Sequence, residues 1–227
     1  MPTSSMLLLL ADGRFPAGAH AHSGGLEAAV AAGRVTDLGT LGEFLRGRLA
    51  TAGLVGAAFA AAAHRAVPTA DRAAELGRLD AELDARTAAP ALRTVSRRQG
   101  RALLRAGRAI WPYAPFGDLP GGAAGPHQPL VFGLLAAAAG LSRTETALAA
   151  AHGTVTGAAS AGVRLLGLDP YHVQALLIAL AGACDTTAAD AARAADGPPE
   201  ELPAAAAPLA DIHAEAHVTW EVRLFAS

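Results

Sequence analysis

Two pairs of histidines come nearest to a reactive constellation in this sequence. His20 and His22 stand in the stretch PAGAHAHSGGLE, and His213 and His217 are four residues apart in DIHAEAHV. Residues at i and i+4 on one helix can share a metal ion, but two ligands do not complete a zinc site. The zinc-protease pattern also needs Glu directly after the first His, and Glu215 comes one position too late. All four histidines are therefore only weak metal candidates, the prediction is no metal site and no cofactor, and His213 is better interpreted as a packed or interface residue.

Other catalytic machinery is missing. All 18 basic residues are Arg, so the chain carries neither the Lys of a P-loop nor one for a Schiff base. The segment GAASAG has Ala158 where a nucleophile elbow requires Gly. The single Cys184 lies in an apolar run, which is typical of a core residue in a reducing compartment. We therefore expect a protein that is not an enzyme and that is cytoplasmic.

The stretch PAGAHAHSGGLEAAV predicts a shaped loop followed by a helix. Pro16 and the glycines break regular structure and allow backbone angles closed to other residues. Ser23 or Gly24 can cap a helix from Leu26 to Ala32, with Glu27 in its first turn, where a negative charge suits the exposed amides. Because buried side chains would not require such a backbone, we expect this loop to present His22 and Ser23 at the surface. The alternative is that the loop only turns the chain and buries Leu26.

Composition predicts that residues 1–227 form one all-α domain, a bundle of roughly eight to ten helices. Hydrophobic residues make up 52% of the chain but aromatic residues only 4%, and the many alanines favour closely packed helices over a sheet. The pattern predicts helices over residues 5–11, 26–32, 37–66 with a bend at Gly53 or Gly56, 69–86, 90–110, 130–139, 143–166 and 170–183 or beyond. A last helix from Pro208 has Leu209, Ile212, Ala216 and Trp220 along one apolar seam.

The charges are unevenly distributed. Residues 86–108 contain seven Arg and no acid, and residues 140–227 contain ten Asp or Glu against four Arg. A basic ridge is expected on the helix over 90–110, formed by Arg93, Arg97, Arg101, Arg105 and Arg108. A sequence pI of about 6.4 and the lack of interleaved aromatic residues argue against nucleic-acid binding, so a solvated face or a protein contact is the better interpretation. Apolar charge-free runs such as LATAGLVGAAFAAAA are shorter than the ~20 residues that span a bilayer, so no membrane segment is expected.

Four sequence blocks, taken in order, resemble the UreF family of urease accessory proteins. They are LLLLADGRFPAGAHAHSGGLEAAVAAGRV, LRTVSRRQGRALL, PLVFGLLAAAAGL with the later SAGVRLLGL, and the terminal VRLFAS. The sequence departs from the family pattern at Ala19, His20, Gly24 and Ala226, which affects the details of loop packing and tail anchoring.

The resemblance implies an all-α scaffold without chemistry of its own. Such a scaffold would form a homodimer, bind UreD (also called UreH) and recruit the GTPase UreG for nickel insertion into the urease apoprotein. We expect partner contacts in the opening loop, on the basic ridge and in a tail over residues 221–227, which should be mobile in the free chain. The candidate partner-binding residues are His22, Ser23, Gly25, Glu27, Arg97, Arg101, Arg223, Leu224 and Phe225. A His-dependent metalloenzyme and an all-α ligand-sensing regulator are the alternatives.

Overall fold

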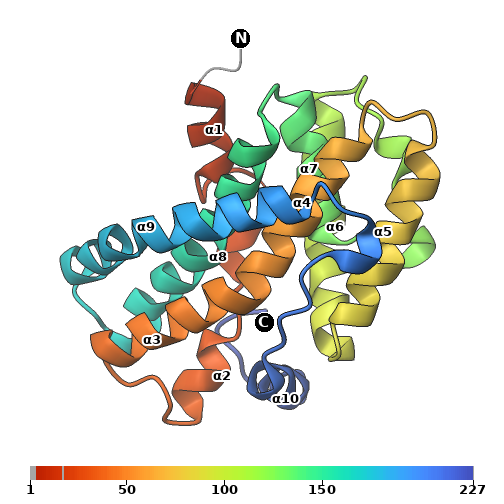
Figure 1. The fold of residues 1–227 in the computed structure, drawn as a ribbon. Coiled ribbons are helices and arrows are strands. Elements are labelled where there is room, and N and C mark those ends of the chain that lie inside the picture. The colour runs from red at the N-terminus through yellow and green to blue at the C-terminus, as the bar shows by residue number, and fades with distance from the viewer. Residues whose placement is uncertain (1–3, 17, 227) are drawn as a thin grey trace.

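The computed structural model describes residues 4–16 and 18–226, and this part of the chain is helical without any strand (Figure 1). The all-α prediction is confirmed. The helices are α1 (Ser4–Ala11), α2 (Leu26–Ala31), α3 (Leu38–Arg48), α4 (Leu54–Ala66), α5 (Arg72–Arg86), α6 (Pro90–Ile110), α7 (Gln128–Ala138), α8 (Arg143–Leu166), α9 (Pro170–Ala194) and α10 (Pro208–His217).

Most helices begin where local chemistry starts them. Asp37 and Ser142 each form a capping box, so that the side chain of the cap and that of the third helical residue satisfy one another's backbone amides at the starts of α3 and α8. Proline is the first residue of α6, α9 and α10, where its missing N–H leaves no helical hydrogen bond unmade. These signals are local, which is why the sequence predicts them well.

Helices α3 and α4 are two parts of one long helix. A single π-helical segment, Leu49–Gly53, joins them, so the expected irregularity lies at Gly53 and not at Gly56. The wider turn inserts one extra residue per hydrogen-bonded loop and changes which residues face the core. The result is an amphipathic α3 followed by an α4 that is buried almost all round.

Helix α4 forms the centre of the core. Every residue from Ala57 to Ala63 is buried, and α7, α8 and α9 pack around this helix. Small side chains allow the helices to approach closely, and α7 comes nearest at Gly133. A Cβ atom added to Gly133 would lie 2.3 Å from the Ala60 carbonyl oxygen, so only glycine fits at this crossing.

Two helices are long and apolar enough to cross a membrane by length and composition alone, namely the continuous helix Leu38–Ala66 and α9. Core helices of soluble proteins pass the same test, and 61% of the most apolar window of Leu38–Ala66 is buried inside this fold. In α9 only 22% of that window is buried. Tyr171 and Ile178 are 84% and 68% exposed, so α9 presents an apolar face to its surroundings.

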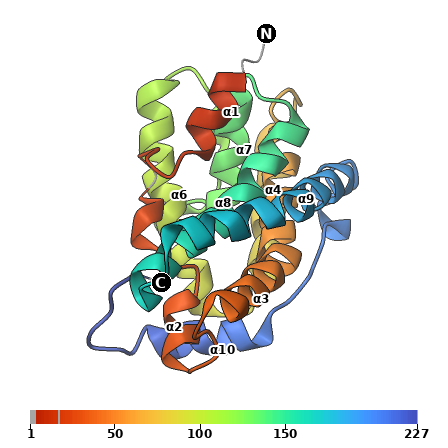
Figure 2. The ribbon, with the colours of Figure 1, turned by 90° about the vertical axis from the view of Figure 1, so that its left-hand side faces the viewer.

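Helix α10 lies on the surface beside α2 and the first part of α6 (Figure 2). The predicted apolar seam is wrong, because Leu209 and Ile212 are 43% and 65% exposed and Ala216 also faces outward. The buried residue of α10 is His217. The reason is that this short helix is oriented by a polar contact of His217, described below, which turns its apolar positions away from the core.

Candidate partner-binding surface

The opening loop ends in a left-handed turn that starts α2. Gly25 is the N-cap of this helix, with φ of 88°, a conformation that side chains with a Cβ rarely adopt. The hydroxyl of Ser23 accepts a hydrogen bond from the Glu27 amide at 3.2 Å, so Ser23 supports the first turn without being the cap itself. The guanidinium of Arg48, on α3, donates to the carbonyl oxygen of Gly24 and so attaches the loop to α3.

Arg48 has an unusual environment for a charged group. Its Nε is buried and has no hydrogen-bond partner in the described part of the chain, and burial lowers the pKa of its guanidinium to about 10. Its guanidinium carbon lies 6.0 Å from the centre of the Phe44 ring. The loop is therefore held by a cation whose charge is only partly compensated.

The expectation that the loop presents Ser23 and Glu27 at the surface is wrong. Ser23 is fully buried and Glu27 is 8% exposed. One oxygen of the Glu27 carboxylate accepts from the Leu224 amide at 2.7 Å, and the other accepts from the Phe225 amide at 3.1 Å and lies 2.8 Å from Nε2 of His217. A carboxylate can leave water only when such donors replace its hydration.

The pKa of Glu27 reflects the same contacts. Burial raises the pKa of this carboxyl group, whereas the Leu224 amide, His217 and the Phe225 amide lower it, and the net pKa lies below the ordinary value of 4.5. The carboxylate is therefore ionised in neutral solution. It binds the end of its own chain, which is why sequence reasoning from the start of α2 alone did not find its role.

The tail, expected to be mobile in the free chain, is docked in this structure. The amide of Ala226 donates to the Ala21 carbonyl oxygen at 2.8 Å, and Phe225 is 3% exposed. The guanidinium carbon of Arg164, on α8, lies 4.4 Å from the centre of the Phe225 ring, a cation–π contact. We call the group formed by Glu27, His217, Leu224, Phe225 and Ala226 the clasp, because it closes the two ends of the fold on one another.

The structure does not gather the four histidines into one metal centre. His217 binds Glu27 and stacks against Trp220 with ring centroids 4.7 Å apart, while His20 is exposed. Among the described residues no group of three or more His, Cys, Asp or Glu side chains could hold a metal ion. Burial, followed by the charges of Arg98 and His20, lowers the pKa of His22 to about 4, so its imidazole is neutral near pH 7.

The basic ridge is smaller than expected. Arg97 is mostly buried and binds Asp80, Asp84 and the Gly125 carbonyl oxygen, at 2.7 to 3.2 Å. Arg97 is thus an internal ion-pair residue, which corrects its assignment to the outer face. The arginines of α6 that remain exposed are Arg98, Arg101, Arg105 and Arg108, and Arg101 also donates to the carbonyl oxygen of Ala124.

Sequence reasoning missed a polar network beneath this ridge. His127 has no exposed surface; its Nδ1 lies 2.9 Å from the Ser96 hydroxyl and its Nε2 lies 2.8 Å from Asp84. The order Ser–His–Asp is that of a hydrolase, but a ring without exposed surface offers no access to a substrate, and the Ser96 hydroxyl already accepts from the Gln128 amide at 3.3 Å. The network joins α5, α6 and the loop before α7. Asp80, which lies among the leucines of the buried face of α5 and binds Arg97, was the available hint.

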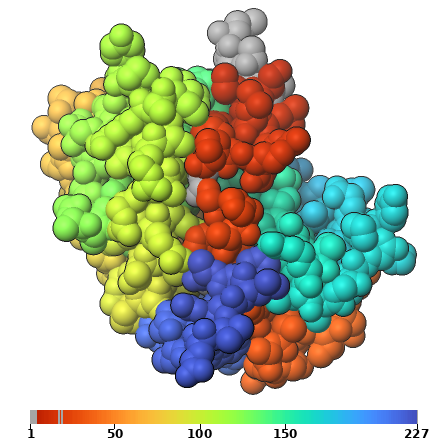
Figure 3. All heavy atoms as spheres, turned by 180° about the vertical axis from the view of Figure 1, so that it is seen from behind, coloured from red at the N-terminus to blue at the C-terminus, as the bar shows by residue number. Residues whose placement is uncertain are grey.

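The candidate residues gather on one face of the molecule, where the first segment of the chain, α6 and the C-terminal segment meet (Figure 3). His22, Ser23, Gly25 and Glu27 come from the loop and α2, and Arg223, Leu224 and Phe225 come from the tail that lies against them. Phe225 points inward, whereas Arg223 and Leu224 remain exposed. Arg101 lies on the exposed side of α6.

Comparison with known proteins shows the family of the chain. Residues 35–181 match the UreF family model. The urease accessory protein UreF of Mycolicibacterium vanbaalenii is 46% identical over 228 residues, and that of Mycobacterium marinum is 45% identical over 227; both alignments cover the whole of each chain. The corresponding protein of Mycobacterium tuberculosis H37Rv is 44% identical over 191 residues, which is 84% of this chain and 86% of the relative. The chain therefore belongs to the UreF family.

Proposed function

We propose that this protein is a non-catalytic scaffold of urease maturation that binds UreD and, through that pair, the GTPase UreG, so that nickel is inserted into the urease apoprotein. The observation that carries the proposal is the full-length similarity to proteins named urease accessory protein UreF. The partners and the nickel step follow from the family resemblance and are part of the proposal, as is a cytoplasmic location.

The face that joins the opening loop, α6 and the tail is the proposed UreD-binding surface. It offers two kinds of group that favour protein contacts, namely exposed arginines and apolar area around Leu224, which is 62% exposed. The clasp fixes the shape of this face before a partner arrives, and a preorganised surface loses less entropy on binding. His22, Ser23, Gly25 and Glu27 then act indirectly, by holding the surface in shape.

We further propose that the homodimer forms through the outward face of α9. Ile178 and Tyr171 are exposed there, and Ala175, Ala179 and Gly182 are exposed at helical spacing between and beyond them. An apolar helix face with small residues allows a second helix to approach closely. This surface lies on a different helix from the clasp, so dimer formation and UreD binding do not compete for the same residues.

Reconstitution tests the scaffold function. Urease apoprotein, UreD, UreG, nickel and GTP are combined with and without the purified chain, and urease activity is followed. We expect activation to depend on the chain, while the chain alone hydrolyses neither GTP nor urea. Equal activation without it would refute the scaffold. One tightly held metal per purified chain, released on changing His213 or His217, would favour the metalloenzyme, and tight binding of a small effector without any partner would favour the ligand-sensing regulator.

A further inference from the structure

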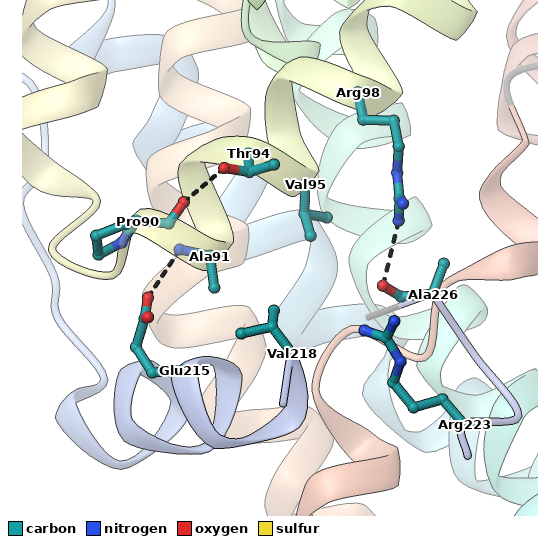
Figure 4. Close-up of a pocket in the computed structure, with 9 residues that line it drawn as sticks. All are labelled: Pro90, Ala91, Thr94, Val95, Arg98, Glu215, Val218, Arg223 and Ala226. Atoms are coloured by element: carbon teal, nitrogen blue, oxygen red, sulfur yellow. Dashed lines mark hydrogen bonds between the residues drawn. The ribbon is translucent and has the colours of Figure 1, made fainter. Parts of the chain in front are cut away.

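A pocket of about 300 Å³ opens between the first turns of α6, the end of α10 and the tail (Figure 4). Val95 and Val218 contribute to an apolar wall. Arg98 and Arg223 line the same pocket, and Figure 4 shows their guanidinium groups converging beside Ala226. The pocket therefore combines two cations with apolar area in a space large enough to receive a side chain.

The two arginines have donors to spare. Within residues 4–16 and 18–226, Arg98 makes one hydrogen bond, to the Ala226 carbonyl oxygen at 3.2 Å, and most of its N–H groups have no acceptor there. Arg223 is exposed and, in the described part of the chain, forms no hydrogen bond or ion pair. Among the described residues, neither cation is paired with a carboxylate.

Glu215 is the one carboxylate among the described residues that line this pocket, and it is already engaged. Its Oε1 accepts a hydrogen bond of 2.7 Å from the Ala91 amide, in the first turn of α6 (Figure 4). A carboxylate at a helix start is stabilised by the free amides and by the helix dipole. Glu215 thus stabilises the start of α6 and does not pair with either of the two guanidinium groups.

We propose that this pocket receives a carboxylate side chain from an acidic segment of a protein partner. Arg98 and Arg223 donate to the carboxylate, since a guanidinium fork matches its geometry, and the valines contact the methylene groups of the incoming side chain. Arg101 and Arg105, exposed farther along α6, extend the same charge to neighbouring acids of the segment. The apolar wall and the net charge of −2 favour a carboxylate-bearing protein over a polyanion such as RNA. This inference rests on the proposed function and adds the chemistry of the contact.

The test measures the affinity of the full chain for UreD, and of the resulting complex for UreG, by titration calorimetry. Arg98→Gln and Arg223→Gln should each weaken one of these two steps about tenfold, because each removes a charged hydrogen bond. Glu215→Gln keeps an oxygen for the Ala91 amide but removes a negative charge, so it should tighten the same step about two- to fivefold. Arg193→Gln, at an exposed arginine in the last turn of α9 away from the pocket, is the matched control and should change the affinity less than twofold, an approximate limit for an exposed charge.

Opposite effects of the Arg and Glu215 substitutions would support the proposal, because loss of folding cannot tighten binding. Unchanged affinity of both steps in Arg98→Gln and Arg223→Gln, with wild-type binding intact, would overturn this proposal and leave the scaffold function standing. Binding of an unstructured RNA oligonucleotide that depends on the two arginines, with protein binding unaffected, would also overturn it. If the wild-type chain binds neither UreD nor UreG, the scaffold function itself is wrong and this inference falls with it.

Discussion

Replacing Glu27 by Ala should release the tail while leaving the helical core folded. The Glu27 carboxylate accepts from two backbone amides of the tail and contacts His217 at 2.8 Å. The variant loses all three contacts, and the two amides then have no acceptor while the tail stays in place. An unsatisfied buried donor is unfavourable by about 1–3 kcal/mol, so undocking, which returns the amides to water, becomes the favourable response.

The free-energy balance of tail docking explains why the loss of one carboxylate is enough to release the tail. Ordering the tail costs about 1–2 kcal/mol for each residue fixed. Without Glu27, the buried Phe225 ring still contributes about 1.5–3 kcal/mol and its contact with Arg164 about 0.5–2 kcal/mol. The hydrogen bonds of Ala226 with Ala21 and Arg98 contribute about 0.5–1.5 kcal/mol each. Together these contributions are smaller than the entropic cost of ordering a segment of several residues. We expect the free energy of unfolding of the whole protein to fall by about 1–3 kcal/mol. This is the usual effect of losing buried hydrogen bonds to a charged group.

Hydrogen exchange followed by mass spectrometry checks this expectation. In the wild-type protein the amides of Leu224, Phe225 and Ala226 should exchange slowly, and in Glu27→Ala they should exchange nearly as fast as in a free peptide, with α4 and α8 still protected. Glu43→Ala, which removes an exposed glutamate of α3, is the matched control and should leave the tail protected. Unchanged protection of the tail in Glu27→Ala would refute the clasp, and simultaneous loss of protection in α4 would show that Glu27 belongs to the core.

Three further outcomes are expected. Because the pKa of His22 is lowered from 6.5 to about 4, the unfolded chain binds more protons between these values, so stability should decrease as pH falls through this window, and His22→Gln should flatten that part of a denaturation series measured against pH. Asp84→Asn removes the charged partner of the buried His127 and should lower the free energy of unfolding by about 1–3 kcal/mol with the far-UV spectrum retained; an unchanged urea midpoint would contradict this. Ile178→Asp should convert a dimer into a monomer in sedimentation experiments, whereas Ile110→Asp, at an exposed isoleucine of α6, should not; a dimer in both variants would exclude α9 as the interface.

Local signals predict most of the fold. The proline starts of α6, α9 and α10, and Ser142 before α8, lie within one turn of the structure they determine, so the sequence alone locates these boundaries. The alanine content also predicts close helix packing, because small side chains let helices approach one another. The limits of α5 and α10 are less well predicted, because α5 begins only at Arg72 and α10 ends at His217, before the expected Trp220.

The clasp and the polar network could not be predicted, because their partners are distant in sequence. Glu27 and His217 are 190 residues apart, and no periodicity relates them. The error at α10 has the same origin: an apolar pattern indicates one face of the helix, and the hydrogen bond between His217 and Glu27 selects another. The position of Asp80 among the leucines of the buried face of α5 indicates that an acid needs a buried partner, but which of the histidines and arginines supplies that partner depends on the fold.

The clasp also sets an order of events during synthesis. The hydrogen bond between Glu27 and Leu224 spans 197 residues, so it can form only after Leu224 has been synthesised and has left the ribosome. The α4 core, by contrast, involves segments that emerge earlier. A chain that stops before Leu224 can therefore build its helices but cannot form the clasp, so the proposed partner-binding surface takes its shape only in molecules that carry the tail.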